Sequence, residues 1–283
     1  MKDIRQSPKW ANYLQSLGWK AEKIDGVTCF YKKLPLSGLM VKIQRPEKLP
    51  LKQVEKFTQK HKTFLLKIEP KDEKHAQILL KNGFKLSRFP LSPPKTIIID
   101  LKKSEDQLLS QMHPKTRYNT KIALRNGIKA EISNDFEAFR KVWLESQKRK
   151  KISFATTSQM EKFWQVFKED CYLILAKDKK GEVLAGILMP IYDQIAYYLY
   201  AGSTKEGNKL FAPTLVTWEA LKIAKQKGAK VFDFEGIYDE RFKGATSGWQ
   251  GFSRFKKSFG GKEVSYSGAF FKTYPSILGI VPF

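Results

Sequence analysis

The feature that most constrains the fold is a series of helical and extended segments that occurs twice along the chain. Runs typical of strands alternate with stretches whose apolar residues recur every three or four positions, as they do in helices. In the first series we expect helices at 7–18, 51–62 and 73–83 and strands at 27–34, 38–44, 63–69 and 94–101. This order predicts helices that flank a mainly antiparallel sheet, which is an α+β fold.

The second series begins after Gly127 and has a similar order. It predicts helices at 135–150, 158–169 and 212–229 and strands at 171–177, 182–192, 194–202 and 231–237. No sequence repeat relates the two series, so they share only the order of their elements. We therefore predict two α+β domains, residues 1–126 and residues 127–267.

The composition is that of a soluble globular protein. The chain has 283 residues, of which 42% are hydrophobic and 28% are charged, enough to form the core of two ordinary domains. Cys29 and Cys171 lie far apart and form no disulfide framework, which favours a reducing compartment. No apolar run has the length of a signal segment or a membrane span, so we expect a cytoplasmic protein.

The net charge of +24 is the unusual bulk property. An excess of this size attracts polyanions by long-range steering and by release of their counterions. It predicts a nucleic acid or another polyanionic partner. The alternative is a source organism whose proteins are all rich in lysine.

Residues 110–127 form a basic segment between the two series. Lys115, Arg117, Lys121 and Arg125 recur at helical spacing, which places several cations on one side of a helix. Because clefts form at domain junctions, we expect Arg117 and Lys121 to contact substrate phosphates. A solvated helix face explains the same spacing.

A second basic segment, SGWQGFSRFKKSFGG at 247–261, lies near the end of the chain. It combines three cations with phenylalanines and a pair of glycines. Lysine and arginine are rarely buried, so the segment suits a nucleic acid or a phosphorylated substrate. A basic surface helix whose phenylalanines pack inward is the alternative.

Motifs of several common enzyme classes are absent from the sequence. It contains no G-x-S-x-G, P-loop, G-x-G-x-x-G or H-E-x-x-H pattern. His61, His75 and His113 are scattered and lack zinc-binding spacing, so we expect no metal and no cofactor. An enzyme of this composition would act by positioning two substrates and stabilising charge.

Six segments together resemble the FemABX aminoacyltransferases. In chain order they are QSPKWANYLQSLGW (6–19), KTRYNTKIALRNGI (115–128), YYLYAGS (197–203), APTLVTWEAL (212–221), FDFEGI (232–237) and FSRFKKSFGGKEVSYSGAF (252–270). Each is weak alone, but their order over nearly the whole chain is specific. The typical pyrophosphate loop of an acetyltransferase is missing, which argues against an acyl-CoA enzyme.

The resemblance implies two acetyltransferase-like (GNAT-like) domains with a substrate channel between them. It implies that residues 268–283 return to the first domain, although membrane contact by this apolar segment is an alternative. The sequence has no heptad run that would form the coiled-coil arm of some family members.

The implied activity is peptide-bond formation outside the ribosome, as in the cross-bridges of the cell wall. An amino acid passes from aminoacyl-tRNA to the amine of a peptidoglycan precursor, which is a UDP-linked or lipid-linked muramyl peptide. We expect a monomer at the inner face of the cytoplasmic membrane.

The resemblance also implies roles for residues of the second basic segment. Phe255 and Lys256 match a pair near the aminoacyl end of the tRNA, and Arg254 precedes them. We expect all three to bind tRNA and Lys256 to be catalytic, through the tRNA terminus or the developing oxyanion. Phe255 would stack on an unpaired base.

Further residues match precursor-binding positions of the family. Tyr200 matches a tyrosine of the substrate channel, and Lys20 or Lys23 is nearest to a lysine that contacts the nucleotide sugar. Asp233 keeps a family position, where we expect a structural cap or a proton-transfer acid, and Glu235 stands where a glycine is common.

One departure from the family leaves other functions open. Residues 153–159 lack the Arg-x-x-x-Tyr pair that grips the precursor in the family. The alternatives are a protein of the same fold that binds RNA or envelope precursors without catalysis, and an acetyltransferase-like enzyme with another acyl donor. Tight, salt-dependent RNA binding without product would identify the binding protein.

Overall fold

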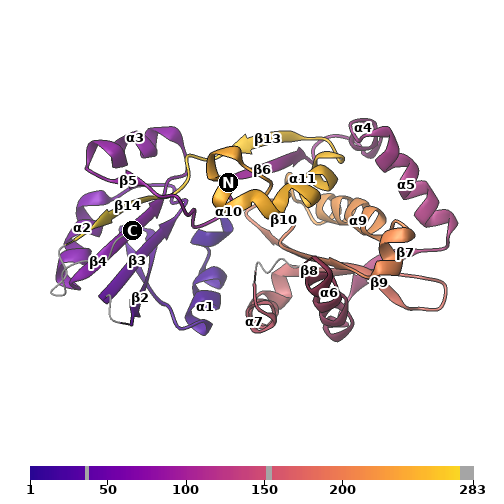
Figure 1. Ribbon diagram of the computed structural model, residues 1–283, viewed down its shortest axis with the longest axis horizontal. Helices are drawn as coiled ribbons and strands as arrows, with labels where there is room; N and C mark the ends of the chain where they lie inside the picture. Colours follow the sequence, from indigo (N-terminus) through magenta and orange to yellow (C-terminus); the bar gives the residue numbers. More distant parts are fainter. Residues whose placement is uncertain (36–37, 151–154, 275–283) are drawn as a thin grey trace. The chain divides into compact units, whose positions relative to one another are not determined.

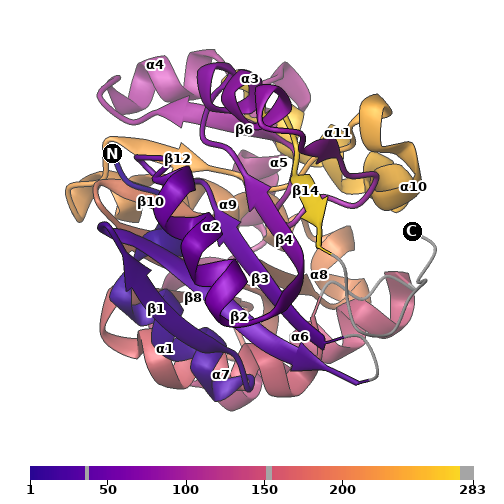
Figure 2. The ribbon, with the colours of Figure 1, turned by 90° about the vertical axis from the view of Figure 1, so that its left-hand side faces the viewer.

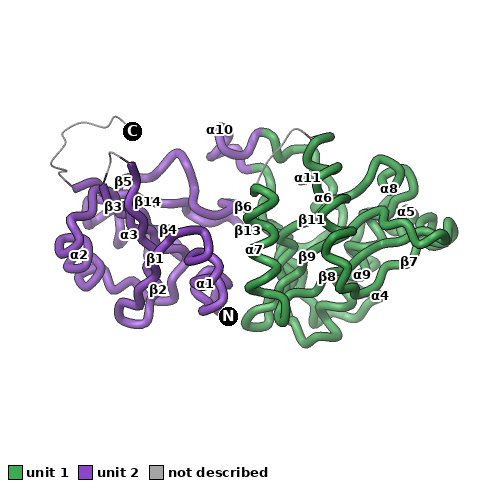
Figure 3. The backbone as a smooth tube through the Cα atoms, turned by 90° about the horizontal axis from the view of Figure 1, so that it is seen from below, with its two compact units in different colours: residues 1, 95–238, 248–264 green, residues 2–94, 239–247, 265–283 purple. Residues whose placement is uncertain are grey.

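The structure is a computed structural model that describes residues 1–35, 38–150 and 155–274. It contains two compact units (Figure 3). The N-terminal unit comprises residues 2–94, 239–247 and the described residues from 265 on, and the central unit comprises Met1, 95–238 and 248–264. Each unit has its own sheet and its own apolar core, so each is described by itself.

A six-stranded sheet forms the N-terminal unit, in the order β1-β2-β3-β4-β14-β5 (Figure 1). Its strands are β1 (Lys20–Ile24), β2 (Val27–Leu34), β3 (Gly38–Gln44), β4 (Thr63–Glu69), β5 (Lys85–Leu86) and β14 (Phe270–Thr273). Neighbouring strands are antiparallel except β3 and β4. β14, from the end of the chain, lies between β4 and the edge strand β5.

Helix α1 of the N-terminal unit begins where a side chain caps it. In α1 (Pro8–Ser16) the Ser7 hydroxyl accepts the Trp10 N–H, and Pro8 takes the first position, where its missing N–H costs nothing. The remaining helices are α2 (Leu51–Lys60), α3 (Glu73–Lys81) and α10 (Lys243–Thr246), with 3₁₀ turns at Ile4–Gln6 and Glu240–Phe242. Helices α2 and α3 bury Val54, Phe57 and Leu79 against Val41, Ile43 and Leu66 of the sheet (Figure 2).

The central unit contains an eight-stranded sheet in the order β13-β6-β12-β10-β9-β8-β7, with β11 paired to β9. Its strands are β6 (Lys95–Asp100), β7 (Lys129–Ser133), β8 (Cys171–Lys177), β9 (Val183–Tyr192), β10 (Ile195–Tyr197), β11 (Tyr200–Ser203), β12 (Val231–Asp233) and β13 (Lys262–Ser265, whose last residue falls in the N-terminal unit). β10 and β12 pair in parallel, whereas the pairs β6–β12, β7–β8, β8–β9, β9–β10 and β9–β11 are antiparallel.

Helix α9 provides the centre of the core in this unit. It is apolar on nearly all sides and buries Leu215, Trp218 and Leu221, among others. The other helices are α4 (Glu105–Ser110), α5 (Pro114–Arg125), α6 (Phe136–Lys150), α7 (Thr157–Phe167), α8 (Lys205–Lys209) and α11 (Gln250–Lys257), with 3₁₀ turns at Lys168–Asp170 and Ser247–Trp249. In the described ranges the longest helices are α6 and α9, with 15 residues each. A helix of this length is too short to form a coiled-coil arm.

The predicted strand at 194–202 is wrong as a single strand. It consists of β10 and β11, which pair with different parts of β9. Between them the Tyr198 N–H donates to the Asp233 carbonyl at 2.8 Å. The pairing with β9 is therefore interrupted at Tyr198, which bonds to the end of β12, and it resumes in β11.

The compact units differ from the predicted domains in residues 239–247 and 265–267, which lie with the N-terminal unit, and in residues 95–126. β6 pairs with β12 and α5 packs on α9, so residues 95–126 lie with the central unit rather than with residues 1–94. The described part of 268–283 lies with the N-terminal unit through β14. Residues 275–283 of that segment are outside the described residues.

Candidate functional site

Lys256 of α11 lies inside the central unit, with only 7% of its surface exposed. Its Nζ donates a hydrogen bond to the Gly236 carbonyl at 2.7 Å. The ammonium also lies 4.8 Å from the ring centre of Phe252, one helical turn earlier, and 5.5 Å from that of Tyr198. Such surroundings strengthen the electrostatic interactions of the charge, because little water screens it.

Lys257, the next residue, points outward. Its ammonium forms an ion pair with Glu263 at 2.6 Å, and Lys95 contacts the same carboxylate at 3.0 Å. The hydrogen bond from Lys257 holds the pKa of Glu263 below its usual value. Adjacent side chains of a helix diverge by about 100°, so one lysine is buried and the other exposed.

The other two residues predicted to bind tRNA differ in exposure. Arg254 is exposed on α11, as a phosphate-binding residue must be. Phe255 is partly buried, packs against the core and meets Phe259 edge to face at 5.2 Å. Its ring therefore has a packing role, and its stacking on a base stays a prediction.

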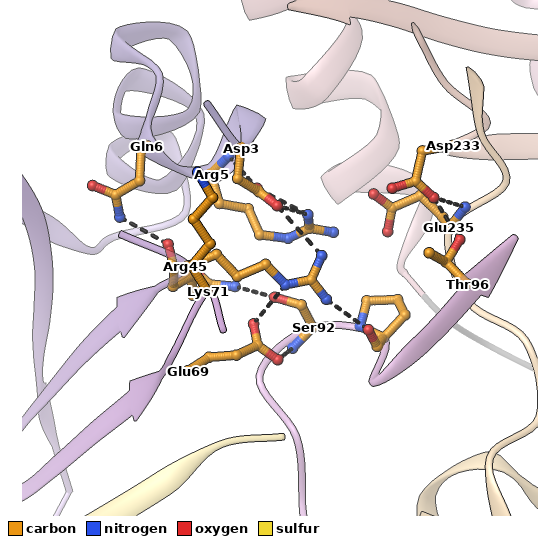
Figure 4. Close-up of polar contacts among 12 residues, drawn as sticks. Asp3, Arg5, Gln6, Arg45, Glu69, Lys71, Ser92, Thr96, Asp233 and Glu235 are labelled. Atoms are coloured by element: carbon orange, nitrogen blue, oxygen red, sulfur yellow. Dashed lines mark hydrogen bonds and ion pairs between the residues drawn. The ribbon is translucent and has the colours of Figure 1, made fainter. Parts of the chain in front are cut away.

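The turn after β12 supplies the carbonyl that Lys256 contacts. Asp233, at the end of β12, is 4% exposed. Its carboxylate accepts hydrogen bonds from the Thr96 hydroxyl of β6 and from the Glu235 N–H (Figure 4). These contacts are those of a turn cap, the structural alternative that the sequence offered for Asp233.

Glu235 has a left-handed backbone conformation, with φ of 58°. Glycine adopts this region without a steric penalty, whereas a residue with a Cβ is strained there. The position where the resemblance expects glycine is therefore one where glycine fits best. The Glu235 side chain is 6% exposed.

Tyr198 is the residue of this site that the sequence did not single out. Burial raises the pKa of its hydroxyl to about 12, although a hydrogen bond with Thr217 lowers it in part. Tyr198 lies among similar tyrosines in IAYYLYAG, so nothing local marks it. Its contact with Lys256 depends on the pairing of β10 with β12.

Tyr200, predicted to lie in the substrate channel, belongs to an aromatic cluster of the central unit. Its ring centre is 6.4 Å from that of Trp143 on α6 and 5.4 Å from that of Phe163 on α7. The side chain is partly buried. These contacts fix its orientation, and its role in precursor binding stays a prediction.

Arg117 and Lys121 of α5 have different surroundings. The Arg117 guanidinium donates to carbonyls at the end of α4, at 3.2 Å for Ser110 and to Met112. A cation at a helix C-terminus satisfies carbonyls that have no partner within the helix. Lys121 is exposed. Arg117 thus has the contacts of a structural residue, and its predicted phosphate contact stays a prediction.

Replacement of Arg117 by Gln is expected to lower the free energy of unfolding by about 1–2 kcal/mol, because the last carbonyls of α4 lose a charged donor. The matched variant Lys121→Gln should change it by less than about 0.5 kcal/mol. Urea denaturation of both variants measures the difference. Equal stabilities, with weaker binding of tRNA to Arg117→Gln, would instead support direct substrate contact.

The N-terminal unit has a pocket of about 260 Å³ between α1 and β1. Its lining residues are Gln6, Pro8, Ala11, Asn12, Gln15, Ala21, Glu22, Lys23 and Thr28. Lys23 is one of the two lysines predicted to contact the precursor. Lys20 is exposed at the start of β1 and is not among the lining residues. Between these two, the geometry favours Lys23.

A network of buried charges joins the N-terminus to the ends of β3 and β4 (Figure 4). Arg45 contacts Asp3 at 3.3 Å and Glu69 at 3.6 Å, and Arg5 contacts Asp3 at 3.0 Å. Burial raises the pKa of Asp3, but Arg5 and Arg45 outweigh it and lower that pKa overall. We interpret the network as structural, because its charges are paired with each other.

Lys42, also in the N-terminal unit, has aromatic surroundings that the sequence did not predict. Its ammonium lies 4.2 Å from the ring centre of Trp19 and 5.9 Å from that of Phe30. Burial, with a smaller contribution from the charge of Arg5, lowers its pKa to about 8. The folded state therefore disfavours the charged form of Lys42.

Lys42→Met is expected to raise the free energy of unfolding at pH 7 by on the order of 1 kcal/mol. Between pH 8 and 10.5 the unfolded chain binds a proton at Lys42 that the folded chain has lost, so the parent protein gains stability with pH over this range. The advantage of the variant should shrink accordingly. Denaturation of both proteins at several pH values measures it, and a constant difference would contradict the prediction.

The described residues contain no group of three or more His, Cys, Asp or Glu side chains that could hold a metal ion. Cys29 and Cys171 are buried thiols in different units, and burial raises the pKa of each. None of the helices in the described ranges combines the length and the apolar character that crossing a bilayer requires.

Two solved structures share the α+β fold of this chain, and one of them is a tandem GNAT protein. The crystal structure of FemX superposes with a TM-score of 0.82 at 21% identity, covering 96% of this chain and 92% of that one. A tandem GNAT protein from the clavulanic acid biosynthesis pathway superposes with a TM-score of 0.53 at 12% identity, covering 88% and 80%. Both confirm the predicted fold class.

The chain belongs to the FemAB family, whose model matches residues 82–179 and 176–277. Among its relatives is a lipid II:glycine glycyltransferase of Staphylococcus haemolyticus, 23% identical over 83% of this chain and 80% of the relative. The protein of the same name from Staphylococcus aureus strain COL is 25% identical over 86% of this chain. The alignment spans 66% of that relative, so part of it has no counterpart in the match.

Proposed function

We propose that this protein is an aminoacyltransferase that moves an amino acid from aminoacyl-tRNA to an amine of a peptidoglycan precursor. The observation that carries the proposal is Lys256, a buried lysine held by the Gly236 carbonyl in the segment that resembles the family's tRNA-binding motif. Family membership and the glycyltransferase activity named for the relatives support it. The net charge of +24 suits a partner as anionic as tRNA.

The proposed chemistry is direct aminolysis. The acceptor amine attacks the ester carbonyl carbon, the new C–N bond forms, and the bond from that carbon to the ribose oxygen breaks. The amine loses a proton and the ribose hydroxyl gains one. Because the ester is already activated, no covalent enzyme intermediate is required. Lys256 stabilises the negative charge that develops on the carbonyl oxygen.

No side chain is assigned as the base in this proposal. Asp233 accepts from Thr96 and from the Glu235 N–H, which favours a structural role for it. A carboxylate of the precursor takes the proton instead. If replacement of Asp233 or Glu235 moved the basic limb of the pH–rate profile, this assignment would be wrong.

The acceptor proposed here is a lipid-linked muramyl peptide. The relatives are named for lipid II, and a soluble UDP-linked precursor is the alternative. Lys23, in its pocket of the N-terminal unit, contacts the diphosphate of the acceptor in this proposal. The charge of a lysine ammonium suits that group.

Incubation with charged tRNA and each precursor, followed by mass analysis of the products, tests the function. A mass gain of one amino-acid residue on the lipid-linked precursor is the expected result. Tight, salt-dependent tRNA binding without any product would identify a binding protein of the same fold. Product formed from an acyl-CoA, and none from charged tRNA, would identify a different acyl donor.

A further inference from the structure

Exposed apolar side chains gather in one short segment of the N-terminal unit. The described residues include seven large hydrophobic side chains that are strongly exposed, and three of them, Leu80, Leu86 and Phe89, fall within residues 80–89. Their exposed fractions are 46%, 53% and 68%. Single exposed apolar residues are normal, but a cluster of them marks a contact surface. We call residues 80–89 the α3–β5 edge.

The backbone of this edge is held in place while these side chains face solvent. Phe84 is buried in the core, and the Ser87 N–H donates to the Ala269 carbonyl at 2.8 Å. The Phe89 carbonyl accepts from Lys67, and its N–H donates to the Ser87 hydroxyl at 3.2 Å. The exposure of the apolar side chains is therefore a property of the folded segment.

The position of the edge in the sheet leaves it open on one side. Among the described residues, β5 is the last strand of its sheet and pairs with β14 alone, and three residues separate it from the end of α3 (Figure 1). Leu86 is the register partner of Phe270, so it lies on the sheet face that α3 covers, just beyond the covered core. Leu80, in the last turn of α3, is close to it along the chain.

The charge of the edge is entirely positive. Lys81, Lys85 and Arg88 are next to Leu80, Leu86 and Phe89 along the chain, and all three cations are exposed. No acidic residue occurs between Glu73 and Asp100. Cations on an edge strand discourage pairing with another strand, which accounts for Lys85. Protection of the edge strand does not explain why Leu86 and Phe89 are exposed beside these cations.

Apolar side chains among cations match the chemistry of an anionic lipid surface. Lysine and arginine meet the headgroup phosphates, while leucine and phenylalanine enter the boundary of the acyl chains. An RNA backbone would use the cations but gives aliphatic side chains no comparable partner. The combination therefore favours a bilayer over a nucleic acid.

We propose that the α3–β5 edge docks on a bilayer that contains anionic phospholipid. Docking through this edge holds the enzyme at the surface from which a lipid-linked acceptor is presented, and that consequence rests on the proposed function. Binding to the bilayer itself does not depend on it.

Cosedimentation of the full chain with vesicles tests the docking. The two compositions are phosphatidylcholine alone and phosphatidylcholine with about 30% phosphatidylglycerol. The parent protein should bind the anionic vesicles at least about tenfold more strongly. Leu86→Ser with Phe89→Ser should weaken that binding roughly tenfold, and so should Lys85→Gln with Arg88→Gln.

Matched controls use exposed residues of the central unit. Tyr118→Ser with Leu124→Ser removes two other apolar side chains, exposed to 60% and 54%, and Lys179→Gln with Lys180→Gln removes two exposed cations. Both should bind vesicles as the parent does. Because all the substituted side chains are exposed, thermal unfolding should be nearly unchanged in every variant.

Absence of parent binding to anionic vesicles, or equal losses in edge and control variants, would overturn the docking. So would loss of tRNA binding in Lys85→Gln with Arg88→Gln when vesicle binding persists, since the edge would then bind RNA. Transfer to the lipid-linked acceptor dissolved in detergent should survive the edge substitutions, while transfer to the same acceptor in anionic vesicles should fall. A parent that transfers to the acceptor in neither form but binds vesicles would contradict only the proposed function.

Discussion

Lys256→Met is expected to reduce aminoacyl transfer by on the order of a hundredfold, the typical effect of losing one donor to an oxyanion. Methionine fills a similar volume but has no ammonium. The Gly236 carbonyl also loses the donor that lies 2.7 Å away, which should lower the free energy of unfolding by about 1–3 kcal/mol. Single-turnover transfer with saturating charged tRNA, at a temperature where the variant is folded, measures the chemical step.

Lys257→Met is the matched control for this experiment. It removes the adjacent charge, whose partner is Glu263 on the surface, and should change transfer less than about threefold. Phe255→Ala should mainly raise the concentration of charged tRNA that is needed, if its ring stacks on a base. Full activity of Lys256→Met would show that Lys256 has no role in catalysis. A larger loss of transfer in Lys257→Met than in Lys256→Met would show that Lys257 is the catalytic lysine.

Asp233→Ala is expected to have the largest effect on stability, a loss of about 3–5 kcal/mol in the free energy of unfolding. The carboxylate is 4% exposed and accepts from two donors, the Thr96 hydroxyl and the Glu235 N–H. Alanine leaves both donors buried without this acceptor. Urea denaturation of the purified variant measures the loss.

The pair of Thr96 and Asp233 provides the control for that prediction. Thr96→Val alone should cost about 1–2 kcal/mol, because it removes one donor and keeps the shape of the side chain. The double variant should be more stable than the sum of the two losses predicts, since the pair is then absent as a whole. Strict additivity would show that the two side chains do not interact in solution.

The stability of the turn after β12 should also affect catalysis, because this turn positions Lys256. Asp233 holds the turn whose Gly236 carbonyl accepts from Lys256. Asp233→Ala should therefore reduce transfer as well as stability, although Asp233 need not touch substrate. A variant with lower stability and unchanged transfer would separate the turn from the site.

Most helices and strands were predictable from the sequence because their signals are local. The Ser7–Pro8 start of α1 and the apolar period of α2 depend on residues within a few positions of each other. The family motifs are local patterns of the same kind, and the fold class they implied is confirmed. The opposite exposures of Lys256 and Lys257 follow from helix geometry alone, once α11 is known to be a helix.

The remaining features depend on contacts between residues that are distant along the chain. Thr96 and Asp233 are 137 positions apart, and Lys256 and Gly236 are 20 apart. Residues 95–126 belong to the central unit because β6 pairs with β12. The predicted strand at 194–202 is interrupted because the Tyr198 N–H donates to the Asp233 carbonyl. The end of α4 decides that Arg117 contacts backbone carbonyls.

The sequence by itself thus determined most of the helices and strands, the fold class and the segments that carry the proposed chemistry, because periodicity, capping residues and motifs depend on neighbouring positions. Only the tertiary structure decided which side chains those segments bury, which they pair and which they leave exposed. Leu86 shows the difference, because no local pattern of residues marks it as exposed. Its exposure arises because β5 is the last strand of its sheet in the part of the chain that the structure describes. Strand order is set by long-range pairing, which no local pattern of residues specifies.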